Sequence, residues 1–121
     1  MQAAQHLGAY DNTKRYNQLA IELLKRIFNG YYKLGARLPS TRELAKQASV
    51  NPNTMQRALQ VLQDEKILIK QSTTGRYVTI DIQYLIKIRN DILEQINHIY
   101  QDEISSYGNN LKNLDINSSD M

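Results

Sequence analysis

Pro52 divides an otherwise helical stretch of this chain in two. Its ring disfavours helical geometry in the residue before it, so an upstream helix must end by about Ser49. The same ring fits the first position of a new helix, and Asn51 is a preferred cap residue directly before it. Farther upstream, Ser40 and Glu43 have the spacing at which each side chain caps the other residue's backbone N–H. The chain must therefore fold here as two helices joined by a tight turn.

Apolar periodicity places a further helix before this pair. Residues 16–28 repeat apolar or small side chains on one helical face, and Gly30 is placed to end that helix. The second helix begins near Thr41 and turns inward Leu44, Ala45 and Ala48. The third helix turns inward Met55, Ala58, Leu59 and Leu62, and turns outward Asn53, Gln56, Arg57 and Gln60. These outward side chains suit base edges or phosphates, although any surface helix has a polar outer face.

A β-hairpin is predicted after the three helices. Two β-rich runs, Ile67 to Lys70 and Tyr77 to Ile80, flank a polar stretch that contains Gly75. This spacing predicts a hairpin with a loop longer than two residues. Three helices followed by a hairpin are the order of a winged helix-turn-helix, so the expected fold is mainly α with a small β-hairpin.

Charge is distributed unevenly along the chain. Residues 14–80 carry 12 Lys or Arg against 4 Asp or Glu, which is +8, whereas residues 81–121 carry 3 against 7, which is −4. Asp11 adds −1 and brings the sum to the net charge of +3. A basic block suits a polyanionic partner, and an unevenly charged solvated surface is the alternative.

Several classes of function find no support in the composition. The chain has no cysteine, no apolar run of the roughly 18 residues that a membrane span needs, and no signal-peptide layout, which predicts a cytoplasmic protein without membrane contact. Its histidines, His6 and His98, have no acid or nucleophile at a recognisable catalytic spacing. We therefore expect no enzymatic activity, no catalytic residue, no metal site and no cofactor.

The last third of the chain predicts a long helix with two apolar stripes. Asp81 is placed to cap a helix that reaches Tyr107, about 39 Å at 1.5 Å per residue. The heptad-spaced stripe predicts a dimer interface made of Ile86, Leu93, Ile96, Tyr100, Ile104 and Tyr107. Beside it run Leu85, Ile88, Ile92 and Ile99. With two stripes, one is able to rest on the parent domain while the other meets a second subunit. Gly108 predicts a bend, so that Leu111 and Leu114 would fold back as a short final helix. An intramolecular core helix is the alternative.

The stretch "GYYKLGARLPSTRELAKQASVNPNTMQRALQVLQDEKILIKQSTTGRYVT" resembles the DNA-binding domain of GntR-type bacterial transcription regulators. The resemblance covers residues 16–80, and the run Val-Asn-Pro-Asn-Thr is similar to the YtrA-like branch, whose members add a very short helical tail. Most other branches have Arg where this chain has Pro52 and Gln56, so their base contacts do not carry over at these two positions.

The resemblance implies a set of DNA-binding residues. Arg42 would meet the operator from the second helix, the start of the third helix would enter the major groove, and residues 74–76 would form the wing. Arg57 is added because it faces outward one turn from the helix start. The predicted DNA-binding residues are Arg42, Asn51, Asn53, Thr54, Gln56, Arg57, Thr74, Gly75 and Arg76.

The expected organisation has three parts. Residues 1–13 are predicted to be a disordered leader, 14–80 a winged helix-turn-helix domain, and 81–121 a helical dimerisation tail. The predicted function is sequence-specific regulation of bacterial transcription by a homodimer on a near-palindromic double-stranded DNA operator. By resemblance, it would repress transporter genes. The sequence does not show whether a small-molecule effector binds. The alternatives are a protein-interaction module or an RNA-binding module, which the polar, aromatic-poor outer face of the third helix disfavours.

Overall fold

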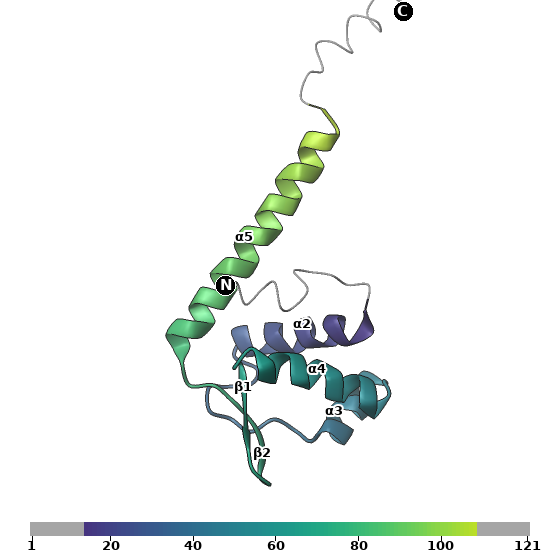
Figure 1. The fold of residues 1–121 in the computed structure, drawn as a ribbon, viewed down its shortest axis with the longest axis vertical. Helices are drawn as coiled ribbons and strands as arrows, with labels where there is room; N and C mark the ends of the chain where they lie inside the picture. The colour runs from purple at the N-terminus through teal and green to yellow at the C-terminus, as the bar shows by residue number, and fades with distance from the viewer. Residues whose placement is uncertain (1–13, 109–121) are drawn as a thin grey trace, which may run out of the picture.

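The computed structural model describes residues 14–108. A body of three helices and a two-stranded hairpin carries one long helix, which projects away from it (Figure 1). The elements in chain order are α2 (Arg15–Phe28), α3 (Thr41–Ala48), α4 (Pro52–Asp64), β1 (Leu68–Gln71), β2 (Gly75–Val78) and α5 (Ile82–Ser106). The predicted fold class, a mainly helical winged helix-turn-helix, is confirmed.

Both predicted caps form at the starts of α3 and α4. The Ser40 hydroxyl accepts from the Glu43 backbone N–H at 3.1 Å, and the Glu43 carboxylate accepts from the Ser40 N–H at the same distance. At α4, the Asn51 carboxamide oxygen accepts from the Asn53 N–H at 2.7 Å, and Pro52 is the first helical residue. The turn between these helices is closed by Ser49, which has a left-handed backbone (φ 56°). Local chemistry thus sets where the two helices begin and end.

The hydrophobic core is built around α4. All four predicted inward residues of this helix are buried, and Leu59 and Leu62 have no more than 1% of their surface exposed. The other core residues from the winged helix body include Leu19, Ala20, Leu23, Leu24, Ile27, Leu38, Leu44, Ala45, Ile67, Leu68 and Val78. Predicted outward residues of α4 are exposed on the opposite side of the helix. Burial of the apolar stripe is what orients the polar one towards solvent.

The hairpin is present, but its strands are shifted from the predicted bounds. The strands pair antiparallel from Leu68 opposite Val78 to Gln71 opposite Gly75, which leaves a three-residue loop at 72–74. The prediction of strands over 67–70 and 77–80 is wrong by one residue for β1 and by two for β2. β2 begins earlier because Gly75 and Arg76 already pair with Gln71 and Lys70 of β1. It ends earlier because Thr79 already takes part in the turn into α5, accepting at its hydroxyl from the Asp81 N–H.

The first turns of α5 rest on the body. Asp81 caps the helix as predicted, with its carboxylate accepting from the Tyr84 N–H at 3.1 Å. Leu85, Ile88 and Ile92 are buried in the same core as α4, so this stripe packs against the parent domain. The Tyr84 hydroxyl donates to the Glu65 carbonyl at 2.5 Å, and burial, followed by the nearby Glu65 carboxylate, raises the pKa of this phenol. The junction between body and tail is therefore a packed one.

Farther along α5, the predicted bend coincides with Gly108, whose backbone is left-handed (φ 86°) directly after the helix. The predicted leader over residues 1–13, with His6, and the predicted return of Leu111 and Leu114 lie outside the described residues.

We expect Asn51→Ala to lower the free energy of unfolding by about 1 kcal/mol, because it removes the side-chain acceptor at the start of α4. Urea titration followed by circular dichroism measures the difference. Asn53→Ala is the matched control, since Asn53 is also exposed in the first turn of α4 but its side chain caps nothing in residues 14–108. Equal losses for both variants would show that the Asn51 cap contributes no specific stabilisation.

Candidate nucleic-acid interface

The start of α4 presents a polar face that no other described element covers. Asn53, Gln56 and Arg57 are exposed there, Thr54 is half-buried, and Asn51 lies exposed at the cap. No acidic residue occupies the first turn of α4. The positive end of the helix dipole therefore acts together with these side chains, an arrangement that favours a negatively charged partner.

The first turn of α3 lies beside the first turns of α4. The Thr41 hydroxyl is 3.3 Å from the carboxamide oxygen of Gln56. Arg42 follows Thr41 in the chain and is exposed. The predicted site residues of α3 and α4 are therefore neighbours on one surface.

The tip of the hairpin is built by Thr74 and Gly75. The backbone N–H and the hydroxyl of Thr74 both donate to the Gln71 carbonyl, at 2.8 and 2.9 Å, and close the loop. Gly75 has a φ of +119°, and a Cβ at this position would lie 3.0 Å from Nε of Arg37. A side chain at Gly75 would thus strain the backbone and displace the Arg37 guanidinium, which lies beside Gly75. The absence of a side chain at Gly75 therefore leaves room for the Arg37 guanidinium beside the wing, in addition to allowing the turn.

Arg76, one of the predicted wing residues, points from β2 back into the body. Its Nε donates to the Gln63 carboxamide oxygen at 3.1 Å, Nη1 to the Thr41 hydroxyl at 3.2 Å, and Nη2 to the Gln56 carboxamide oxygen at 3.2 Å. Burial lowers the pKa of this guanidinium from its usual value, and an arginine stays protonated nonetheless. Arg76 joins the wing to α3 and to α4, and we call this group, Arg76 with Thr41, Gln56 and Gln63, the Arg76 cluster.

Arg57 is held by an aromatic ring. Its guanidinium carbon lies 4.4 Å from the ring centroid of Tyr16, at the start of α2. Stacking of this kind orients a guanidinium and leaves its N–H edge available to another acceptor. Tyr16 thus positions a predicted DNA-binding residue.

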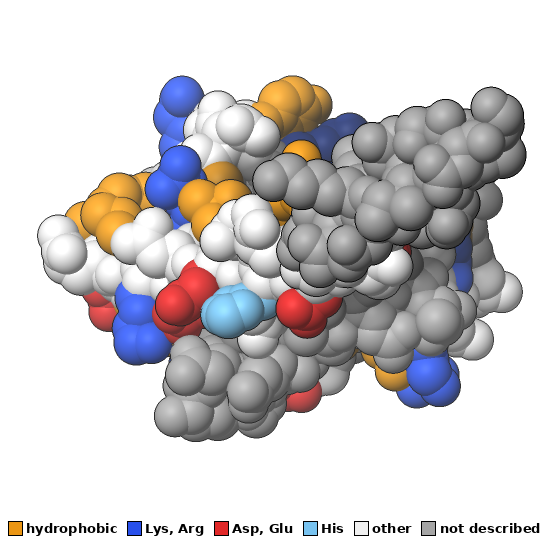
Figure 2. All heavy atoms as spheres, turned by 90° about the horizontal axis from the view of Figure 1, so that it is seen from above, with side chains coloured by type: hydrophobic (Ala, Val, Ile, Leu, Met, Phe, Trp, Pro, Cys, Tyr) orange, Lys and Arg blue, Asp and Glu red, His pale blue; other side chains and the backbone are white. Residues whose placement is uncertain are grey.

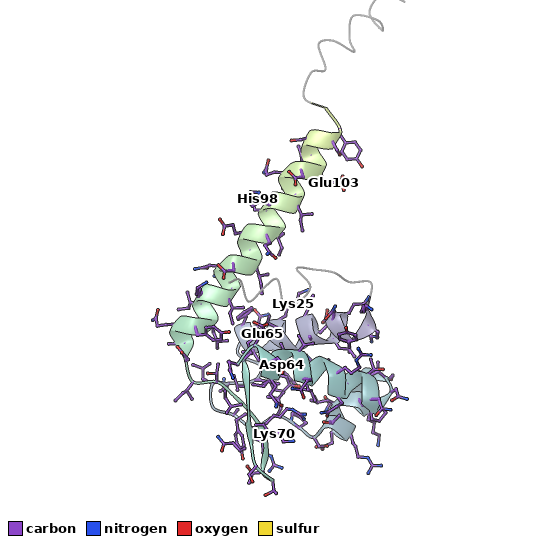
Figure 3. The ribbon with its side chains drawn as sticks, viewed as in Figure 1. Lys25, Asp64, Glu65, Lys70, His98 and Glu103 are labelled. Carbon is purple, nitrogen blue, oxygen red and sulfur yellow. The ribbon has the colours of Figure 1, made fainter. Side chains whose placement is uncertain are left out.

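The cations of the winged helix body have no carboxylate partners among the described residues. Within residues 14–108 an ion pair joins Lys87 to Asp91 on α5, at 3.0 Å, and none of the Lys or Arg residues between 14 and 80 forms one there. Lys70 lies on the hairpin, far from the acidic Glu103 near the end of α5 (Figure 3). The body therefore keeps an uncompensated positive charge at the end opposite the tip of α5.

A second surface lies along α5. Its exposed apolar residues are Ile82, Ile86, Leu93, Ile96, Ile99, Tyr100, Ile104 and Tyr107. Seen along the helix, hydrophobic side chains gather on one side, and acidic side chains with the histidine lie on another (Figure 2). All six residues of the predicted dimer interface are among the exposed ones, and Ile99, from the neighbouring stripe, is exposed as well.

Four residues of the surface formed by the hairpin and the starts of α3 and α4 were not predicted from the sequence: Tyr16, Arg37, Thr41 and Gln63. Gln63 follows Gln56 by seven residues, so both lie on one face of α4, and this spacing was a usable signal. Thr41 and Arg76 are 35 residues apart, and no local pattern connects them.

Among residues 14–108, His, Asp and Glu side chains form no group of three that is able to hold a metal ion. No helix there is both long and apolar enough to cross a membrane.

Comparisons with known proteins converge on one family. The family model described as "Bacterial regulatory proteins, gntR family" matches residues 15–78. Among curated proteins, the chain is similar to the HTH-type transcriptional repressor YtrA of Bacillus subtilis, with 34% identity over 56% of this chain and 52% of YtrA. It is also 39% identical over 53% of its length to YjiR of Escherichia coli, an HTH-type transcriptional regulator. The chain spans about half the length of YtrA and 14% of YjiR.

Solved structures match nearly the whole chain. A GntR family transcriptional regulator from Listeria monocytogenes is similar with a TM-score of 0.75 and 33% identity, over 91% of this chain and 98% of that one. YtrA from Sulfolobus acidocaldarius, a GntR-family transcription factor, is similar with a TM-score of 0.51 and 26% identity, over 93% and 94% of the two chains. These two matches extend beyond the winged helix body into the region of α5.

Proposed function

Since this chain belongs to the GntR family of bacterial regulatory proteins, which are DNA-binding transcription regulators and not enzymes, we propose that it is a repressor that binds a near-palindromic operator as a homodimer. The similarity to YtrA proteins from two organisms supports the YtrA-like branch of the family.

The observation that carries this proposal is the exposed polar face at the start of α4. Asn53, Gln56 and Arg57 stand on it in the first turns of a helix whose N-terminus attracts phosphate, with Arg42 beside them. Recognition helices of helix-turn-helix proteins contact base edges with the residues of their first turns. We assign Asn51, Asn53, Thr54, Gln56 and the wing residues 74–75 to the major groove and the flanking backbone. Arg42 and Arg57 would contact phosphates.

The tail would form the dimer interface. We assign residues 14–80 to DNA binding and the region from residue 81 onwards to dimerisation. The exposed apolar residues Ile86, Leu93, Ile96, Tyr100, Ile104 and Tyr107 support this assignment, since a second copy of α5 would remove them from water. A twofold dimer presents two recognition helices about one turn of duplex apart, roughly 34 Å, which matches an inverted repeat.

The biological setting is proposed from similarity. The protein would act in the cytoplasm, where its operator lies. Repression is proposed because the curated relative YtrA is a repressor. Neighbouring transporter genes are proposed as targets only from the resemblance of the Val-Asn-Pro-Asn-Thr run to the YtrA-like branch.

Selection of bound sequences from a random duplex DNA library tests the proposal. We expect an inverted repeat to be enriched, with an affinity that falls roughly 10³-fold between 50 and 200 mM salt, because several phosphate contacts release counterions. Binding that depends on salt but enriches no sequence would refute operator recognition. In that case single-stranded RNA of random sequence would be the next ligand to test.

A further inference from the structure

The Arg76 cluster determines how one predicted base-contacting side chain is oriented. An arginine offers only donors, so every group within hydrogen-bond distance of its guanidinium must present an acceptor. Nη2 of Arg76 lies 3.2 Å from Oε1 of Gln56. The carboxamide oxygen of Gln56 must therefore face Arg76, and its NH₂ group must point the other way.

The same oxygen has a second donor. The Thr41 hydroxyl lies 3.3 Å from Oε1 of Gln56 and also accepts from Nη1 of Arg76 at 3.2 Å. A hydroxyl that accepts from a guanidinium can still donate its own proton, and Oε1 of Gln56 accepts it. A carboxamide oxygen has two lone pairs, and the two donors, Arg76 and Thr41, use both.

The N–H donors of Gln56 are left for an outside partner. The Gln56 side chain is exposed, whereas Arg76 is partly buried behind it. Among the described residues, the NH₂ group of Gln56 makes no hydrogen bond. Gln56 thus presents donors, and only donors, from the outer face of α4.

This orientation has a consequence for base reading. A free glutamine commonly contacts adenine with both ends of its carboxamide, accepting from N6 and donating to N7. With its oxygen occupied, Gln56 lacks the accepting half of that pair. Guanine, with acceptors at N7 and O6, and thymine, with an acceptor at O4, remain complementary to a donor in the major groove.

We infer that Arg76 and Thr41 are positioning residues that make Gln56 select a guanine or thymine edge instead of adenine. The inference rests on the proposed operator recognition and specifies one base preference within it. It also gives Arg76 a role other than a phosphate contact, since a phosphate contact carries no sequence information.

The test compares selected sequences for four variants with those of the wild type. Gln56→Ala identifies the operator position that Gln56 reads, as the position where the preference is lost. Arg76→Met releases the carboxamide oxygen, and we expect the ratio of adenine to guanine or thymine at that position to rise roughly 10-fold. Thr41→Val removes one of the two donors and keeps Arg76, so a smaller shift in the same direction is expected even if Arg76→Met folds poorly.

Lys70→Met is the matched control. Lys70 is the cross-strand partner of Arg76 in the hairpin, so its replacement removes the same charge at the same level of the wing. We expect it to weaken binding to all sequences alike, by about 10-fold at low salt, without changing the preference at the Gln56 position.

Failure of the Gln56 base preference and failure of the proposed operator recognition would give different results. Enrichment of no sequence by the wild-type protein would refute the proposed function, and the inference would fall with it. An enriched operator with adenine at the Gln56 position, or a preference that Arg76→Met and Thr41→Val leave unchanged, would overturn the inference alone. A uniform loss of affinity in Arg76→Met, like that in Lys70→Met, would also overturn it, because it would make Arg76 a phosphate contact.

Discussion

Leu93→Asp together with Tyr100→Asp is expected to produce a monomer that is folded but binds its operator poorly. Leu93 is 46% exposed and Tyr100 is 61% exposed, and neither belongs to the core cluster that joins α5 to the body. The two aspartates would therefore leave the fold of the body intact. In a dimer seam they would place four carboxylates in an apolar contact, which is strongly unfavourable because each would be buried without a partner.

Loss of the dimer should carry over to DNA binding. A dimer places its second recognition helix at a high effective concentration near the second half-site, an advantage worth about 10² to 10⁴ in affinity. We expect the operator affinity of the double variant to fall by at least roughly 100-fold. Sedimentation velocity measures the mass, and fluorescence anisotropy with the selected operator measures the affinity.

His98→Asp with Ser105→Asp is the matched control for this prediction. These two exposed residues are also seven apart on α5, but they project from the side of the helix away from Leu93 and Tyr100. The control should remain dimeric and retain its operator affinity within a few fold. An unchanged mass in the Leu93 and Tyr100 variant would show that this face is not the seam.

Arg42→Ala combined with Arg57→Ala is expected to weaken operator binding by about 100-fold at low salt while the dimer persists. Both side chains are exposed on the surface made by the starts of α3 and α4. If each contacts a phosphate, each loss removes about one unit from the salt dependence of log K and roughly 10-fold in affinity. The base preferences of the remaining binding should stay the same, because phosphate contacts do not read sequence.

Lys25→Ala with Lys87→Ala is the matched control, because it also removes two positive charges but at positions away from this surface. Lys25 lies in the last turn of α2, near the end of the body where α5 begins, and Lys87 pairs with Asp91 on α5 (Figure 3). We expect this control to lose less than about 3-fold in affinity through the long-range field alone. Equal losses in the two double variants would mean that net charge matters and that Arg42 and Arg57 make no direct contact. Thermal unfolding of Arg57→Ala is needed beside them, since its stacking on Tyr16 contributes about 0.5–1 kcal/mol.

Helix starts were predictable because their signals are local. The Ser40 and Glu43 pair, the Asn51 cap and the Asp81 cap each act within three residues, so the sequence shows both partners side by side. The strand bounds were less predictable. β-propensity extended the second strand to Ile80. Regular pairing ends at Val78, because Thr79, whose N–H still donates to the Ile67 carbonyl, already accepts from the Asp81 N–H at the start of α5.

The site was predictable as a set of exposed residues but not as a set of contacts. Residues Asn53, Gln56 and Arg57 follow from the polar stripe of α4, since the apolar stripe must face inward. The direction of Arg76 did not follow from any pattern. Its three acceptors lie 13, 20 and 35 residues away in the chain, on two different helices.

Local chemistry alone therefore accounts for the element order, the helix caps and the two apolar stripes of α5, because each depends on neighbours within a turn or two. The packed chain decided which stripe of α5 the body covers and which it leaves exposed, since that depends on where the core of α2 and α4 lies. It also decided that Arg76 turns inward to hold the oxygen of Gln56. Hydrogen bonds between residues far apart in sequence exist only once packing has brought their elements together, and bonds of this kind orient Gln56 at the proposed DNA-binding surface.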